Sequence, residues 1–271
     1  MPHLKTQKGI TWNYEIDGEG PALVFVHGWG GDLRLWSGQS EYFSKDFQVI
    51  RLDLPGHGRS SWKKTDLPTI ARDLEELFKN LNIPEINIVG SSLGGLVILQ
   101  WFDLFPKRFK RIAWVGSLPK FLQVDGDFSF GLKLNWLRKL DGQLETNYPK
   151  IVDIFFRSLF TPIERRTDRY RYLTQFRRNE IVAQKDALKE FLNILKKEDL
   201  RRVISKIRAS KIPIQILNGT DDYICSKESV LYLQQELPHS EVKFFQDCGH
   251  FPFLTRVKEF NSALETFLKR E

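Results

Sequence analysis

The stretch INIVGSSLGGLVILQWF at residues 86–102 decides the fold of this 271-residue chain. Apolar, β-branched residues at 86–90 predict a buried strand, and residues 92–105 predict a helix. Between them, GSSLG has the form G-x-S-x-G, in the strand-to-helix context that this pattern requires. Glycines flank so sharp a turn because side chains there would collide with neighbouring backbone. The turn predicts that Ser92 presents its hydroxyl above the end of a sheet, at the positive end of a helix dipole.

Short apolar runs alternate with helical patterns on both sides of this turn. Strands are predicted at residues 10–16, 22–27, 47–53, 86–90, 111–115, 212–218 and 241–245, and helices at 67–82, 92–105, 226–237 and 257–269. The alternation predicts an α/β fold, with a mostly parallel sheet and helices on both of its faces.

Residues 119–205 interrupt the alternation. They are rich in aromatic residues, have helical spacing and contain no convincing strand. We therefore predict an α/β core formed by residues 1–118 and 206–271. Residues 119–205 are expected to form a helical lid over the end of the sheet.

A serine nucleophile needs a base and an acid that orients the base. In this kind of fold their order along the chain is serine, acid, histidine. Of the five histidines, only His250 is both late in the chain and placed after a predicted strand. Asp221 and Asp222 both follow the strand at 212–218, and the ends of strands are where open α/β sheets place their sites. We predict Ser92, Asp222 and His250 as the catalytic triad; Asp222 is preferred because similar sequences place the acid three residues after the glycine, and Asp221 remains the alternative.

The glycine-rich stretch HGWGG at residues 27–31 follows another predicted strand. Small residues let backbone N–H groups converge in front of Ser92, where the oxyanion of an acyl-transfer reaction needs donors. By position, the backbone amides of Trp29 and Leu93 are the predicted oxyanion hole. A phosphate-binding loop is the weaker alternative, because neither G-x-G-x-x-G nor a Lys-Ser/Thr ending is present. His27 and His57 are expected to be structural.

Most of the excess positive charge lies in the predicted lid. The chain carries 41 Lys and Arg against 34 Asp and Glu, a formal net charge of +7, and residues 119–205 carry 18 against 12, which is +6. Between residues 157 and 178 there are seven arginines: Arg157, Arg165, Arg166, Arg169, Arg171, Arg177 and Arg178. A solvated helical face and a surface for an acidic partner are both consistent with this charge.

The composition excludes several classes of protein. With 41% hydrophobic and 28% charged residues it is ordinary for a globular enzyme. The sequence has no apolar run of about 18 residues and no signal-peptide pattern, so we expect a cytoplasmic protein that does not enter a membrane. Cys225 and Cys248 are too few for a disulfide framework and lack the spacing of a zinc site. We expect a monomer with no metal, no organic cofactor and no nucleic acid partner.

Several motifs together resemble the α/β-hydrolase superfamily across essentially the whole chain. They are HGWG at 27–30, DLPGHGRS at 53–60, GSSLGGL at 90–96, NGTDD at 218–222 and GHFPF at 249–253. Within the superfamily, the chain is most similar to the pimeloyl-[acyl-carrier protein] methyl ester esterases of biotin synthesis, with lid residues 139–144, 148–156 and 198–201 adding to the match.

The resemblance implies roles for further residues. Trp29 and Leu93 would form the oxyanion hole and bind substrate, and Phe155 would touch the acyl chain. The candidates for docking a carrier protein are Lys150, Arg157, Arg165, Arg166 and Arg169. Three positions depart from the pattern: Ile154 stands where an arginine is expected, Ser91 replaces an aromatic residue, and the stretch TRV at 255–257 lacks the usual proline.

We therefore predict a serine carboxylic ester hydrolase that cleaves the methyl ester of pimeloyl-[acyl-carrier protein] through an acyl-enzyme. An aromatic lid suits an aliphatic chain, and an arginine-rich lid suits an acidic carrier protein bearing a phosphopantetheine arm. A carboxylesterase of small free esters and a low-turnover signal receptor of the same fold are the alternatives. Dehalogenases and epoxide hydrolases are disfavoured because they need a carboxylate where Ser92 stands.

Overall fold

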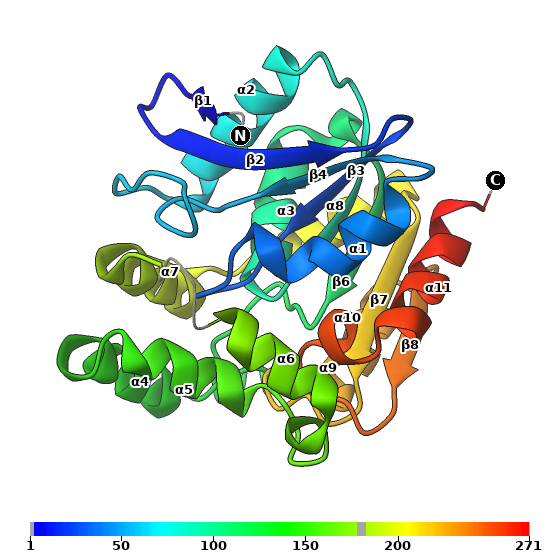
Figure 1. The fold of residues 1–271 in the computed structure, drawn as a ribbon. Coiled ribbons are helices and arrows are strands. Elements are labelled where there is room, and N and C mark those ends of the chain that lie inside the picture. Colours follow the sequence, from blue (N-terminus) through cyan, green and yellow to red (C-terminus); the bar gives the residue numbers. More distant parts are fainter. Residues whose placement is uncertain (1–2, 178–182, 271) are drawn as a thin grey trace.

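The computed structural model describes residues 3–177 and 183–270, with the side chains of 175–177 left out. Within these residues one sheet has eight strands, in the order β1-β2-β4-β3-β5-β6-β7-β8 (Figure 1). The strands are β1 His3–Lys5, β2 Thr11–Asp17, β3 Ala22–Val26, β4 Gln48–Leu52, β5 Ile86–Ser91, β6 Phe109–Val115, β7 Ile214–Gly219 and β8 Glu241–Phe245. β2 pairs antiparallel with β1 and β4, whereas all pairs from β4 to β8 are parallel. The predicted mostly parallel sheet is confirmed.

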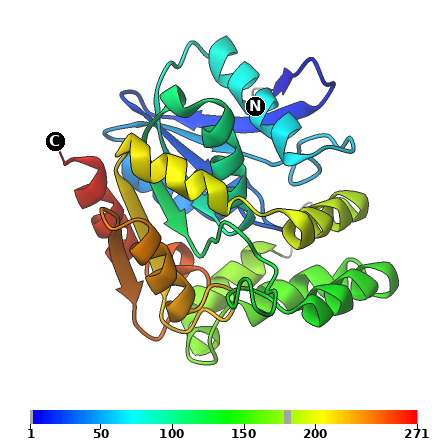
Figure 2. The same ribbon diagram turned by 180° about the vertical axis from the view of Figure 1, so that it is seen from behind.

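Helices cover both faces of the sheet, as predicted (Figures 1 and 2). On one face α2, α3 and α8 pack together, with α9 beside α8, and on the other face α1, α10 and α11 pack together. Their bounds are α1 Ser37–Phe43, α2 Leu67–Asn80, α3 Leu93–Leu104, α8 Arg201–Ser210, α9 Lys227–Glu236, α10 Pro252–Thr255 and α11 Val257–Leu268, with short 3₁₀ helices η1 Leu33–Trp36 and η2 Pro106–Arg108.

Local sequence explains where these elements begin and how deeply they lie. Asp66 caps α2, because its side chain accepts a hydrogen bond from the Thr69 amide, and a proline follows in the first turn. Residues 93–102 of α3 are all buried, since this helix lies between the sheet, α2 and α8. The helix that begins at the Ser92 turn is therefore held on all sides.

The predicted lid region is helical and lies at the edge of the sheet where the parallel strands end (Figure 1). It contains α4 Leu134–Thr146, α5 Lys150–Ser158, η3 Glu164–Arg166, α6 Asp168–Arg177 and α7 Lys185–Lys197. Isolated bridges join Lys120 to Asp199, Leu122 to Leu132 and Val124 to Phe128. Arg178 and the side chain of Arg177, two of the seven arginines, lie outside the described residues.

The two ends of this helical region meet where they leave the core. The Leu200 amide donates to the Pro119 carbonyl at 2.8 Å, and Lys120 Nζ lies 2.8 Å from Asp127 and 3.0 Å from Asp199. The helix α8, which the predicted boundary at residue 205 divides, packs against α3. The chain thus leaves and re-enters the core at one place.

The close approach of α3 to β3 depends on a missing side chain at Gly94. A Cβ there would lie 2.5 Å from the Val26 carbonyl oxygen and 2.9 Å from that of His27. We predict that Gly94→Ala lowers the free energy of unfolding by about 1–3 kcal/mol, because backbone cannot yield as a flexible side chain can. Urea denaturation measures this change.

Gly142, in the exposed part of α4, is the matched control. A Cβ there would meet nothing within 4 Å. Gly142→Ala should raise the free energy of unfolding by up to about 1 kcal/mol, since alanine is the better helix former. An equal effect at both positions would contradict the close-approach explanation.

Candidate active site

Ser92 occupies a strained turn between β5 and α3. Its φ is 53° and its ψ −119°, a backbone conformation that non-glycine residues rarely adopt. Surrounding hydrogen bonds hold it there: the Ser92 amide donates to the Val115 carbonyl at 2.9 Å, and the Ser92 carbonyl accepts from the Gly95 amide at 2.9 Å and from the Ser117 hydroxyl at 2.7 Å. The half-buried serine is thus fixed in place by its own backbone.

His250 and Asp222 form a buried pair at the ends of β8 and β7. His250 Nδ1 lies 2.7 Å from Asp222 Oδ2, and the other carboxylate oxygen accepts from the amides of Ile224 at 2.8 Å and Cys225 at 3.1 Å. The two residues are 2% and 4% exposed. With Nδ1 held by the carboxylate as a donor, Nε2 is left as the nitrogen that can accept a proton.

The neighbouring aspartate has different surroundings. Asp221 is exposed, and its carboxylate accepts a hydrogen bond from the Thr220 hydroxyl at 2.9 Å. Of the two aspartates that the sequence left open, the structure places Asp222 against His250.

Gly116, at the end of β6, lies between the serine and the histidine. Its neighbour Val115 holds the Ser92 amide, and a Cβ on Gly116 would lie 2.8 Å from His250 Nδ1 and 3.0 Å from Asp222 Oδ2. Only a glycine leaves room for that pair. Ser92, Gly116, Asp222 and His250 follow four adjacent parallel strands, β5 to β8, so the three predicted triad residues gather at one edge of the sheet.

The loop at residues 27–31 passes directly beside Ser92. A Cβ on Gly28 would lie 3.0 Å from the Ser92 Cβ and 3.7 Å from its Oγ. Within the described part of the chain, neither the Trp29 amide nor the Leu93 amide donates a hydrogen bond. Leu93 opens α3, where amides are left without a partner inside the helix. Both predicted oxyanion donors are therefore available to a ligand.

Two buried histidines brace that loop. His57 Nε2 accepts from the Gly30 amide at 3.2 Å, and His27 Nε2 accepts from the Leu54 amide at 3.0 Å. Accepting through Nε2 requires a neutral ring. Burial lowers the pKa of both imidazoles, that of His57 to about 3. These histidines join the loop at 27–31 to the segment at 53–60.

Phe155 connects this loop to an apolar groove between α4 and α5. Its ring lies 4.9 Å from the Trp29 ring and 5.9 Å from the Trp136 ring. The groove has a volume of about 500 Å³, and its walls are mainly Trp136, Leu140, Ile151, Ile154, Phe155 and Tyr223. Its apolar walls suit an aliphatic chain.

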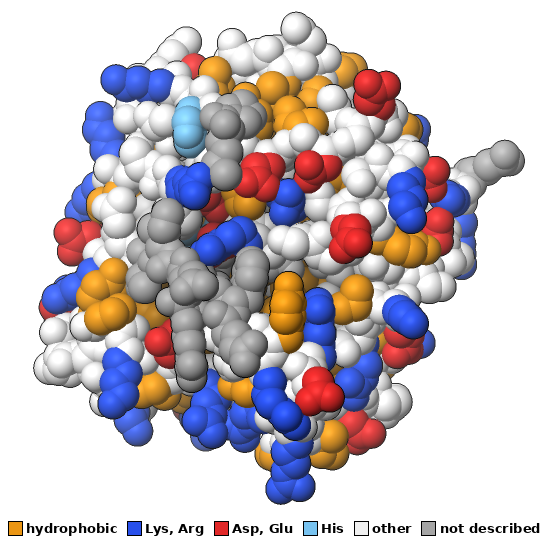
Figure 3. Space-filling view, viewed as in Figure 1, with side chains coloured by type: hydrophobic (Ala, Val, Ile, Leu, Met, Phe, Trp, Pro, Cys, Tyr) orange, Lys and Arg blue, Asp and Glu red, His pale blue; other side chains and the backbone are white. Residues whose placement is uncertain are grey.

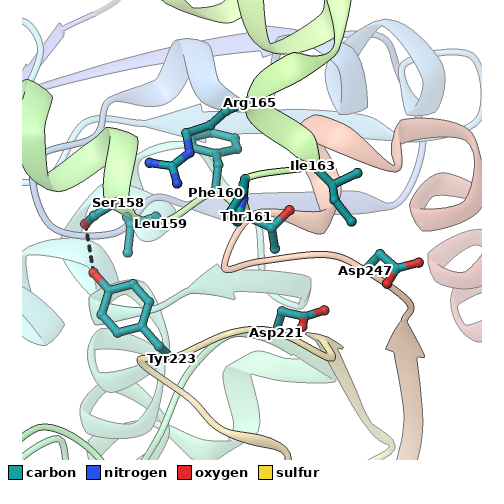
Figure 4. A pocket seen from close by; sticks show the side chains of 10 residues that line it. Ser158, Leu159, Phe160, Thr161, Ile163, Arg165, Asp221, Tyr223 and Asp247 are labelled. Carbon is teal, nitrogen blue, oxygen red and sulfur yellow. Dashed lines mark hydrogen bonds between the residues drawn. The ribbon is translucent and has the colours of Figure 1, made fainter.

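A second pocket, of about 380 Å³, adjoins the groove (Figure 4). Ser158 and Tyr223 line both, and their hydroxyls are 2.8 Å apart. Figure 4 shows Arg165 reaching in from the helical region, with Asp221 and Asp247 on the loops of the core. Unlike the groove, this pocket has two carboxylates among its walls, those of Asp221 and Asp247.

The five residues predicted to dock a carrier protein lie in α5, η3 and α6, a region where Lys and Arg gather at the lower edge of the molecule (Figure 3). Lys150, Arg157 and Arg166 are exposed, and Arg165 is half-buried. Arg169 has a structural contact: its Nε donates to the Leu254 carbonyl at 2.9 Å, and its guanidinium lies 5.5 Å from the Tyr172 ring. One N–H group of its guanidinium thus joins α6 to α10.

Sequence reasoning missed Gly116 and Tyr223. A glycine directly after the strand next to Ser92 is a signal of close approach and could have identified Gly116. Tyr223 directly follows Asp222, but only the fold shows that it lines the groove. In the described ranges 3–177 and 183–270, no three His, Cys, Asp or Glu side chains are grouped to hold a metal ion, and no helix has the length and apolar character to span a membrane.

Comparison with known proteins gives one consistent family. The sequence model of the alpha/beta hydrolase fold family matches residues 21–257. A pimeloyl-[acyl-carrier protein] methyl ester esterase of Cronobacter sakazakii is 31% identical over 93% of this chain and 94% of its own, and one of Nitrosomonas europaea is 28% identical over 93% and 97%. Among solved structures, an esterase from Exiguobacterium antarcticum matches with a TM-score of 0.90 at 22% identity, over 99% of both chains.

The amides that hold Asp222 make its replacement by asparagine informative. Because the amides of Ile224 and Cys225 require an oxygen, Asp222→Asn would turn its NH₂ group toward His250 and force the ring proton onto Nε2. That nitrogen could then no longer act as a base. We predict a loss of about 10⁴-fold in kcat for ester hydrolysis. Asp221→Asn, the matched control, should change kcat less than about threefold; the opposite ranking would move the acid to Asp221.

The buried His57 makes stability depend on pH. In the unfolded chain its imidazole takes up a proton below about pH 6.5, but in the folded protein only near pH 3, so folding loses stability as pH falls through that window. Between pH 7 and pH 5 the wild type should lose about 2 kcal/mol more than His57→Gln, which does not titrate. Urea denaturation at the two pH values tests this, and equal losses would mean that His57 does not set the acid sensitivity.

Proposed function

We propose that this chain, which belongs to the α/β-hydrolase family, hydrolyses the methyl ester of a pimeloyl group carried on acyl carrier protein, as its relatives are named for doing. It is a carboxylic ester hydrolase. The observation that carries the proposed chemistry is the 2.7 Å contact of His250 with Asp222 beside the strained turn at Ser92.

The proposed reaction has two acyl-transfer steps. His250 Nε2 takes the hydroxyl proton as Ser92 Oγ attacks the ester carbonyl, and Asp222 stabilises the imidazolium. The backbone amides of Trp29 and Leu93 hold the oxyanion, each contributing about 3 kcal/mol to lowering the barrier. The imidazolium gives its proton to the departing methanol. Water, deprotonated by His250, then cleaves the acyl-enzyme and regenerates Ser92.

The groove between α4 and α5 supports an aliphatic acyl chain as substrate. It meets the proposed oxyanion loop through the contact of Phe155 with Trp29, and its volume of about 500 Å³ is ample for seven carbons and part of a pantetheine arm. Burying the methylene groups against Trp136 and Ile151 would contribute about 0.8 kcal/mol for each group. We propose that the acyl chain lies along this groove with its methyl ester at Ser92.

The exposed basic residues of α5 and η3 support a carrier-bound substrate. Acyl carrier proteins are acidic, and exposed opposite charges raise the rate of encounter. We propose Lys150, Arg157 and Arg166 as the main docking cations, with Arg165 reaching the second pocket and Arg169 contributing less because it is held by Leu254. A carrier-bound substrate fits the cytoplasmic, monomeric enzyme expected from the sequence.

The docking proposal is tested by a double variant, Arg157→Ala/Arg166→Ala. At low salt we expect kcat/KM for the carrier-bound methyl ester to fall about tenfold, while kcat/KM for p-nitrophenyl butyrate stays unchanged, since a small neutral ester gains nothing from the charges. The loss should shrink at high salt, because screening shortens the Debye length below its value of about 8 Å at physiological salt. Steady-state kinetics with both substrates at two salt concentrations provide the measurement.

Two controls accompany this experiment. Lys107→Ala/Lys110→Ala removes the same charge at the other end of β6 and should leave both substrates unaffected, whereas Ser92→Ala should abolish turnover of both. Wild-type activity on p-nitrophenyl butyrate alone would favour an esterase of small free esters. No turnover of either ester would favour the signal-receptor alternative and overturn the proposed function.

A further inference from the structure

Glu164, in η3 of the helical region, is a buried carboxylate with no part in the mechanism above. It is 1% exposed. No cation forms an ion pair with it among residues 3–177 and 183–270 as described. A charge so buried is costly unless hydrogen bonds replace the lost water. The donors that surround it therefore indicate what this carboxylate does.

Three donors from two parts of the fold point at this carboxylate. Oε2 accepts from the Thr161 amide at 2.8 Å and from the Gly249 amide at 3.0 Å, and Oε1 accepts from the Thr255 hydroxyl at 2.5 Å. Thr161 belongs to the helical region itself. Gly249 and Thr255 lie on either side of the histidine, before His250 and at the end of α10. The carboxylate thus clamps both ends of the loop that carries His250.

A second contact fixes the same loop from the same turn. The His250 amide donates to the Leu159 carbonyl at 2.9 Å, so two successive amides of the histidine loop bond to residues 159–164. The fit is tight: a Cβ on Gly249 would lie 2.3 Å from the Leu159 carbonyl oxygen and 3.1 Å from Glu164 Oε2. Figure 4 shows this turn, with Leu159, Thr161 and Ile163, beside the loops of the core.

The charge of Glu164 is also felt within the histidine loop. Burial raises the pKa of the Cys248 thiol, and the neighbouring carboxylate of Glu164 raises it further.

From these contacts we infer that Glu164 is a positioning residue: it holds the loop of His250 at the place where the imidazole can serve Ser92, so the helical region builds part of the catalytic centre as well as covering it. The inference rests on the proposed role of His250 in ester hydrolysis. Because Glu164 acts on the geometry of the reacting groups, loss of its carboxylate should lower kcat and leave substrate binding intact.

The test compares Glu164→Ala with Glu164→Gln, using p-nitrophenyl butyrate, which does not depend on carrier docking. Glu164→Ala leaves the amides of Thr161 and Gly249 without their acceptor and removes the shorter hydrogen bond of the Thr255 hydroxyl. We expect kcat to fall about tenfold to a hundredfold with KM changed less than about twofold, since a small displacement of a reacting group has effects of this size. Glu164→Gln should recover most of kcat, because its carbonyl oxygen can accept from Gly249 and its NH₂ can donate to Thr255.

Two further variants separate positioning from stability. Glu145→Ala removes an exposed carboxylate that pairs with Lys185 and Lys189 in the same region, and it should leave kcat unchanged. Thr255→Val removes one hydrogen bond of Glu164 and should give a smaller loss of kcat. This variant tests the inference if Glu164→Ala does not fold. Melting temperatures and active-site titration with a fluorophosphonate give the folded, reactive fraction of each variant.

The outcomes are distinct. Wild-type kcat per folded site in both Glu164→Ala and Thr255→Val, or a loss of kcat in Glu145→Ala equal to that in Glu164→Ala, would overturn the inference. A wild type that turns over no ester would overturn the proposed function instead.

Discussion

The turn at Ser92 constrains everything around it. Its positive φ is tolerated because hydrogen bonds to Val115, Gly95 and Ser117 hold the backbone from both sides. The same turn places the start of α3 against the end of β3, so closely that there is no room for a side chain at position 94. This close contact also fixes the distance between Ser92 and the loop at 27–31. The site is thus a consequence of how tightly one helix meets one sheet.

The remaining groups of the site are held by the ends of neighbouring parallel strands. β6 brings Gly116, β7 brings Asp222 and β8 brings His250 to the same edge, so the three loops pack on one another. Buried hydrogen bonds then decide the state of each ring: Asp222 sets the tautomer of His250, while His27 and His57 stay neutral because they accept backbone amides. The strands thus fix where the side chains of the site lie, and the hydrogen bonds fix how these side chains are oriented.

Much of this could be predicted from sequence because it depends on local patterns: β-branched runs predict the central strands, and GSSLG with its flanks predicts the turn. Other features depend on distant partners. The seven-residue α1 was not predicted, since its buried Gln39 is satisfied by Phe253 and Asn261, more than 200 residues away. Likewise β1 has only three residues, and it forms by pairing with β2. The letters NGTDD alone leave Asp221 and Asp222 as alternatives, whereas in the structure the amides of Ile224 and Cys225 hold one oxygen of Asp222 and the other oxygen faces His250.

The two ends of the helical region are joined to each other, and this affects whether the region can be exchanged between related enzymes. Where an insertion leaves and re-enters a core at one point, here joined by Leu200 and Pro119, its internal length costs the core little entropy. Such a segment would be interchangeable between related enzymes if it were only a cover. The contacts of Leu159 and Glu164 with the histidine loop remove that freedom, because a transplanted segment must bring its own acceptors for the amides of Gly249 and His250. Chimeras of this protein therefore have to exchange the helical region and the loop after β8 as one unit.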